Sequence, residues 1–105
     1  MDTIYALSTA SGKAGVAIIR VSGPKAPQAA LTLSQDLPEP RMAAKKLLRS
    51  VDGERIDQAL VLFFEQGASF TGEPIVEFHL HGSTAVIKAV LSELAKIEDF
   101  RLAEA

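Results

Sequence analysis

The stretch Ile75–Ile97, IVEFHLHGSTAVIKAVLSELAKI, changes from a two-residue to a helical apolar repeat, and this change decides the fold. Its first part, Ile75–Leu80, predicts a strand with apolar side chains on one face, the predicted core face: Val76, Phe78 and Leu80. Its second part, Thr84–Ile97, predicts a helix with one apolar stripe, formed by Val86, Ile87, Val90, Leu91, Leu94 and Ile97. Ser83 or Thr84 is expected to cap that helix.

A second strand and helix precede this stretch. Val16–Val21 (VAIIRV) is β-branched and mostly apolar, which predicts a central strand. Gly23-Pro24 ends it, and Lys25–Gln35 follows as a helix. Small side chains share one face of this helix and predict close packing on a sheet: Ala26, Ala29, Ala30 and Leu33. Ile4–Leu7 is expected to form a short first strand.

A hairpin is expected in the middle of the chain. Ala43–Val51 is predicted to be extended, Asp52-Gly53 is a strong turn signal, and Asp57–Phe64 returns as a strand. The apolar half of that strand is predicted to be buried on both faces. Phe100–Ala103 is either a last strand or the start of a linker. The predicted order is β-β-α-β-β-β-α-β, an α+β fold with a mixed sheet, two main helices and the helices on one face.

The composition is typical of one globular domain of 105 residues, 48% hydrophobic and 23% charged. A net charge of −2 lacks the basic excess of a domain that binds nucleic-acid phosphates by itself. The chain has no cysteine, which excludes disulfides and thiolate metal sites. The start is not a signal peptide, and the longest apolar run, Ala59–Phe64, is far below the roughly 20 residues of a membrane span. We therefore expect a soluble, cytoplasmic domain without membrane contact, and its ending at Ala105 suggests a piece of a longer protein.

Two charged residues interrupt apolar strands and are the candidate site. Arg20 lies within VAIIRV, and Glu77 lies within IVEFHL, on the face opposite the predicted core. A charge close to a core is paired, hydrogen-bonded or directed into a polar site. The pattern therefore leaves open a structural Arg20–Glu77 ion pair, two solvated charges, or a ligand site.

Two other motifs are weaker. Glu77, His79 and His81 have the residue types of a metal site, but same-face neighbours on a strand are roughly 6.5 Å apart, which disfavours one shared ion. No metal is therefore assigned. The segment Ser11–Ala14 is similar to the end of a phosphate-binding loop, but Leu7 replaces its first glycine and Ala14 its hydroxyl residue. We expect no nucleotide site and assign no catalytic residue.

Taken together, several segments resemble the start of the tRNA-modifying GTPases of the MnmE/TrmE family. They are DTIYALSTASGKAGVAIIRVSGP from Asp2, then SFTGE from Ser69, VEFHLHG from Val76, and RLA from Arg101. They occur in the family's order and approximate spacing over essentially the whole chain. Three departures are Pro74, where the family has an acidic residue after SFTGE, Ser83, which replaces the second glycine of its HGG, and Ala68, which stands where a proline is common.

The resemblance implies an N-terminal domain, residues 1–105, with a fold similar to the folate-binding fold of aminomethyltransferases. It implies homodimerisation and binding of a reduced folate, 5-formyl- or 5,10-methylenetetrahydrofolate, as the one-carbon donor for modification at carbon 5 of the wobble uridine. The matching folate positions are Arg20 and Glu77. In the full-length protein it implies GTP, Mg²⁺ and a monovalent cation such as K⁺, a helical and a GTPase domain, and the partners tRNA and the flavoprotein MnmG/GidA.

The chemistry of these two residues agrees with that implication. A carboxylate such as that of Glu77 can accept two parallel hydrogen bonds from the N3–H and 2-amino groups of a pterin. Arg20 can contact the folate or hold Glu77 in place. Two alternatives remain: a structural dimerisation module without a ligand, and a small metal-dependent enzyme that uses Glu77, His79 and His81.

Overall fold

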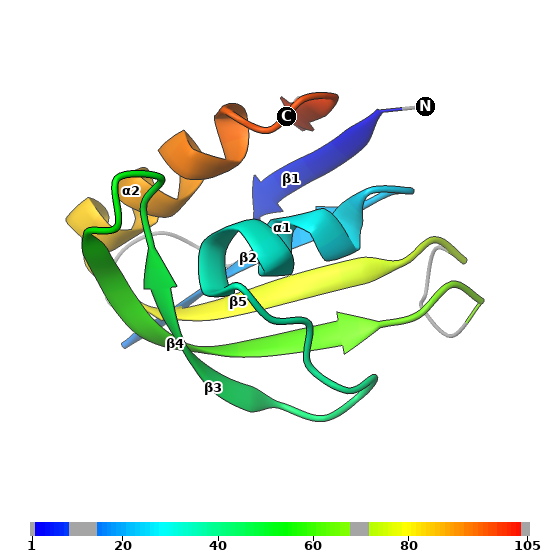
Figure 1. Cartoon of the computed structure of the whole chain (residues 1–105), viewed down its shortest axis with the longest axis horizontal. Helices are drawn as coiled ribbons and strands as arrows, with labels where there is room; N and C mark the ends of the chain where they lie inside the picture. The colour runs from blue at the N-terminus through cyan, green and yellow to red at the C-terminus, as the bar shows by residue number, and fades with distance from the viewer. Residues whose placement is uncertain (1, 9–14, 68–71, 104–105) are drawn as a thin grey trace.

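The computed structural model describes residues 2–8, 15–67 and 72–103, which form one sheet and two helices in the predicted order (Figure 1). The α+β prediction is confirmed. The elements are β1 (Thr3–Leu7), β2 (Val16–Ser22), α1 (Ala26–Ser34), β3 (Ala44–Arg49), β4 (Arg55–Phe64), β5 (Ile75–His81), α2 (Thr84–Ala95) and β6 (Phe100–Leu102).

The six described strands lie in the order β3-β4-β5-β2-β1-β6. Neighbouring strands are antiparallel except β1 and β6, which pair in parallel and make the sheet a mixed one. Phe100–Leu102 is therefore an edge strand, which decides between the two expectations for this segment. β2 and β5 lie side by side near the middle of the sheet, which places the two charge-interrupted strands next to each other.

Both helices cover the same face of the sheet (Figure 1). In α1 the small side chains predicted to face the sheet are all buried, and they let the helix approach closely: Ala26, Ala29, Ala30 and Leu33. In α2, Val90 and Leu94 are fully buried against the sheet. The predicted core face of β5 is confirmed, because Val76, Phe78 and Leu80 are at most 1% exposed.

Two local features fix where the helices begin. Ser83 is the N-cap of α2, and its hydroxyl accepts a hydrogen bond of 3.2 Å from the backbone N–H of Val86, as predicted. The family departure at this position therefore supplies a cap. Before α1, Gly23 has a φ of 141°, and a Cβ there would lie 2.7 Å from the Cα of Thr3. Only glycine fits this contact between β1 and the end of β2.

One prediction about β4 is wrong. The sequence predicts that its apolar half is buried on both faces, but only one face is fully covered: Ala59 and Val61 are buried, whereas Leu60 is 44% exposed. The reason is that both helices pack on one side of the sheet. The other side, which we call the open face, carries alternate residues of all the central strands, namely Ile4, Ala6, Ile18, Arg20, Leu60, Leu62, Glu77 and His79.

Within the described ranges, neither helix is long and apolar enough to span a membrane.

Candidate functional site

Arg20 and Glu77 meet at the centre of the open face. They are direct register partners in the antiparallel pair of β2 and β5, so their side chains leave the sheet side by side. Nε of Arg20 donates to Oε2 of Glu77 at 2.8 Å, and Nη2 lies 2.7 Å from the same oxygen. The Glu77 side chain is 13% exposed and that of Arg20 is 49% exposed. The Arg20–Glu77 ion pair, one of the alternatives that the sequence did not decide, is therefore present, and its cation faces solvent.

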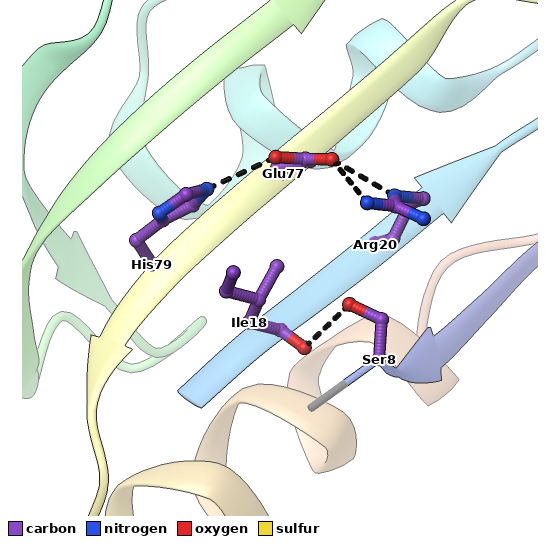
Figure 2. A network of polar contacts seen from close by, with 5 residues as sticks. All are labelled: Ser8, Ile18, Arg20, Glu77 and His79. Carbon is purple, nitrogen blue, oxygen red and sulfur yellow. Dashed lines mark hydrogen bonds and ion pairs between the residues drawn. The ribbon is translucent and has the colours of Figure 1, made fainter. Parts of the chain in front are cut away.

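His79 completes this group, which we call the Glu77 cluster: Arg20, Glu77 and His79. Nε2 of His79 lies 3.0 Å from Oε1 of Glu77, and Figure 2 shows the carboxylate between the imidazole and the guanidinium. A carboxylate accepts about four hydrogen bonds. Three contacts are already made, two at Oε2 and one at Oε1. One acceptor position is therefore left, and it belongs to Oε1.

The surroundings keep Glu77 ionised. Burial raises the pKa of its carboxyl group, but the hydrogen bonds from His79 and Arg20 and the charge of Arg20 outweigh burial and hold the pKa below its ordinary 4.5. At neutral pH the group is therefore a hydrogen-bond acceptor only. It can bind a ligand that presents N–H or O–H donors, and it has no proton to give.

His81 does not join the Glu77 cluster, although it shares the same strand face. Its ring Nδ1 lies 2.7 Å from Oδ1 of Asp57, and its backbone N–H donates to Oδ2 of Asp57 at 2.9 Å. The Asp57 side chain is 9% exposed, so this carboxylate fixes the orientation of the His81 ring. The metal alternative needs Glu77, His79 and His81 on one ion, and the structure places His79 and His81 on different carboxylates.

In the part of the chain that the structure describes, no three side chains of the metal-ligating types gather in one place.

A groove of about 420 Å³ lies beside the Glu77 cluster, at the end of β5. We call it the His79–His81 groove. Its side-chain lining comes from β2, β3, β4 and β5, and consists mainly of Val16, Lys45, Gln58, Leu60, His79 and His81. His79 belongs both to the groove and to the Glu77 cluster, so the two are continuous.

Two sequence motifs fall outside the described residues. The segment Ser11–Ala14, judged unable to bind nucleotide, lies within residues 9–14, and most of SFTGE lies within residues 68–71. Their interpretation rests on the sequence.

The fold and this cluster define a class of protein: a small α+β domain with a mixed sheet, helices on one face and a paired carboxylate at the centre of the other face. The family model of the N-terminus of the GTP-binding protein TrmE matches residues 3–105. The chain therefore belongs to the TrmE N-terminal family, and the family prediction made from the motifs is confirmed.

Curated relatives agree with this assignment. The chain is 54% identical over 105 residues to the "tRNA modification GTPase MnmE" of Roseobacter denitrificans, and this match covers 100% of the chain and 24% of the relative. It is 52% identical over 105 residues to the protein of that name from Cereibacter sphaeroides, again with 100% and 24% covered. It is 53% identical over 103 residues to the protein of that name from Phenylobacterium zucineum, a match that covers 98% of the chain and 23% of the relative. The chain thus spans about a quarter of the length of these relatives.

Proposed function

We propose that this chain is the N-terminal domain, residues 1–105, of a tRNA-modifying GTPase, and that its open face binds a reduced folate at Glu77 and Arg20. The observation that carries the folate proposal is the state of Glu77. It is an ionised, mostly covered carboxylate in mid-sheet that retains one acceptor position at Oε1 and borders a groove.

The pterin of a folate presents two parallel donors, N3–H and the 2-amino group. One of them fits the remaining acceptor position on Glu77. The second, parallel to the first, meets the other oxygen, Oε2, which already accepts from Nε and Nη2 of Arg20. We therefore expect one of these two contacts to give way when a pterin binds, while the other keeps the orientation of the carboxylate. The bound group would supply a one-carbon unit, and the chain's own residues bind and orient it.

Isothermal calorimetry of the chain with 5-formyltetrahydrofolate tests this proposal. We expect saturable binding of one ligand per chain, and weaker binding by Arg20→Ala, because that variant loses both hydrogen bonds that orient Glu77. Absence of saturable binding by a folded wild-type chain would contradict folate binding. It would favour the alternative of a dimerisation module without a ligand.

Homodimerisation is the second part of the proposal, and the uncovered apolar surface of the open face supports it. Leu60 is 44% exposed there, and Leu31 on α1 is 43% exposed on the helix side. A two-fold contact through the open face would remove Leu60 from water and leave Leu31 unchanged. In this arrangement the ligand lies next to the subunit contact, because Leu60 also lines the His79–His81 groove.

Light scattering on matched variants tests the dimer. We expect wild type and Leu31→Lys at twice 11.2 kDa, and Leu60→Lys shifted toward 11.2 kDa. The two leucines are equally exposed, so a general effect of an added charge would change both variants alike. A wild-type monomer at micromolar concentration would contradict dimerisation by this chain.

The remaining activities belong, in this proposal, to parts of the longer protein. They are GTP hydrolysis with Mg²⁺ and a cation such as K⁺, and wobble-uridine modification on tRNA together with MnmG/GidA in the cytoplasm. A GTPase and folate assay of the full-length protein tests this division: Glu77→Gln should lower folate binding and leave GTP hydrolysis unchanged.

A further inference from the structure

One edge of the sheet carries a run of positive charge. Residues 40–51 contain four cations and no acid, in a chain whose net charge is −2. Half of this segment is β3, the edge strand next to β4 (Figure 1). Of the four cations, Lys46 is neutralised by an ion pair with Asp36. The other three and the first residue of β4 form a group that we call the basic edge: Arg41, Lys45, Arg49 and Arg55.

No carboxylate neutralises the basic edge. Within the described ranges none of its four side chains forms an ion pair. Arg49 donates from Nη1 to the backbone oxygen of Gly53 at 3.0 Å, and this acceptor is uncharged. Asp52 and Glu54 lie in the connection between β3 and β4, yet neither acid pairs with an arginine of the edge. The positive charge at this edge is therefore available to a partner.

Two of these cations are held opposite each other. Arg49 and Arg55 are direct register partners in the antiparallel pair of β3 and β4. Like charges in opposite positions destabilise a strand pair. Lys45 lies four residues before Arg49 on the same face of β3, which adds a third positive charge roughly 13 Å away. An anionic partner that contacts both arginines would remove their repulsion.

The arrangement favours a phosphate backbone over a simpler explanation. Charged residues on an edge strand also prevent it from pairing with another sheet, but acids serve that purpose as well as cations do. Three of the four residues of the basic edge are arginines, and a guanidinium binds the oxygens of a phosphate through two parallel hydrogen bonds. A row of cations along a strand suits a polymer with regularly spaced phosphates, which is a nucleic acid.

We propose that the basic edge binds the phosphate backbone of the tRNA. This inference rests on the proposed role of the chain in a tRNA-modifying GTPase, and it gives the tRNA a contact surface on this domain. Contacts to phosphates hold a nucleic acid in place without reading its sequence. Since the domain has a net charge of −2, the basic edge supplies a few of these contacts, and other parts of the longer protein supply the rest.

The salt dependence of tRNA binding by the full-length protein tests this proposal. The probe is a fluorescent, unmodified tRNA transcript, titrated by anisotropy between about 50 and 200 mM KCl. We expect the double variant Arg49→Ala with Arg55→Ala to weaken binding about tenfold at low salt. The slope of log affinity against log salt should become less steep by about 2, one for each lost phosphate contact. Arg49→Glu with Arg55→Glu should bind more weakly still, because it repels phosphate.

A matched control removes the same charge elsewhere. Lys88→Ala with Arg101→Ala changes one residue on α2 and one on β6, the opposite edge strand, and should bind tRNA like wild type. Lys45 stays in place in all variants, because it also lines the His79–His81 groove. Each variant should keep the circular dichroism spectrum and the 5-formyltetrahydrofolate affinity of wild type, which separates the basic edge from the Glu77 cluster.

The outcomes distinguish this inference from the proposed function. If wild type binds tRNA and both arginine variants bind it equally well, the basic edge is overturned as a contact while the tRNA function stands. If the alanine variant alone binds weakly and the glutamate variant binds like wild type, the edge serves only against strand pairing, and the inference is overturned. Equal losses in the control would show a general effect of charge, with the same consequence. If the wild-type full-length protein does not bind tRNA, the proposed function itself fails.

Discussion

Glu77→Gln replaces one carboxylate oxygen with an amide NH₂ at the centre of the Glu77 cluster and keeps the shape of the side chain. The remaining oxygen can stay with Arg20 and accept from Nε and Nη2, now without the negative charge. The new NH₂ group then faces Nε2 of His79, where the carboxylate oxygen was an acceptor at 3.0 Å. In the tautomer with its proton on Nδ1, the His79 imidazole can accept a hydrogen bond from this NH₂ group at Nε2.

The cost to the protein without ligand follows from these contacts. Two hydrogen bonds between opposite charges become bonds from the Arg20 guanidinium to a neutral amide oxygen, a loss of about 1 kcal/mol each for fully buried groups. Arg20 is 49% exposed, so solvent screening reduces this loss. We therefore expect Glu77→Gln to lower the free energy of unfolding by about 1–2 kcal/mol. Each kcal/mol lost lowers Tm by about 4–8 °C in a domain of this size. A fully buried ion pair would lose about 3–5 kcal/mol.

The cost to folate binding is larger. A pterin donor that meets the NH₂ group finds another donor, and the charge-assisted bond is lost. Together these effects should weaken binding by about 2–3 kcal/mol, which is roughly 30- to 150-fold in Kd. The assay is calorimetric titration with 5-formyltetrahydrofolate beside thermal unfolding without ligand. Glu65→Gln, which changes an exposed acid on the loop after β4, is the control and should resemble wild type in both measurements.

The two measurements together decide the role of Glu77. A folded Glu77→Gln variant with the folate affinity of wild type would refute its assignment as a folate contact. A loss of unfolding free energy of several kcal/mol with no separate loss of affinity would make Glu77 a structural partner of Arg20 alone. If treatment of wild type with a chelator causes the same loss of folate affinity as Glu77→Gln, the metal alternative would be supported again.

Three further predictions concern the rest of the chain. Glu93→Ala should lower the free energy of unfolding by about 1–3 kcal/mol in denaturant melts, because Oε1 of Glu93 accepts the N–H of Val51 at 2.8 Å and joins α2 to the β3–β4 hairpin. Lys96→Ala removes only the ion pair to Oε2 of Glu93 and should lower the free energy of unfolding by less than about 1 kcal/mol in the same melts. Tm should fall as the pH drops below about 4.5, because four carboxyl groups have lowered pKa values in the folded state. Hydrogen bonds from Lys46, Lys96 and Lys25 lower the pKa values of Asp36, Glu93 and Asp99, and the pKa of Glu77 is lowered despite its burial. The folded state therefore binds fewer protons than the unfolded state in this pH range, and a Tm that stays constant from pH 5 to 3 in calorimetry would contradict this. The chain should not bind GTP, because Leu7 and Ala14 replace the glycine and hydroxyl residues of a phosphate-binding loop, and saturable binding of fluorescent GTP would contradict that interpretation.

The fold was predictable where one element carries its own signal. The alternation in Ile75–Leu80 and the helical stripe in Thr84–Ile97 are properties of local sequence, and both match the structure within a few residues. The burial of β4 was not predictable in the same way. Whether Leu60 is buried depends on which faces of the sheet the two helices cover, and one helix on each face would have buried it. This choice is a property of connections between elements, which the apolar pattern of one strand does not contain.

The site shows the same division between local and non-local information. Arg20 and Glu77 were identified because a charge in an apolar strand is costly and needs a partner, and their pairing then follows from antiparallel β2 and β5. The contact of His81 with Asp57 left no such signal, because Asp57 lies before the apolar run Ala59–Phe64 and does not interrupt it. Its partner is fixed only by how β4 and β5 lie against each other. The consequence is chemical: His81 lies roughly 13 Å along β5 from Glu77 and binds Asp57, and Glu77 keeps His79 alone and retains an acceptor position. The two carboxylates thereby hold one histidine of the strand each, which leaves Oε1 of Glu77 at the centre of the open face able to accept one further hydrogen bond.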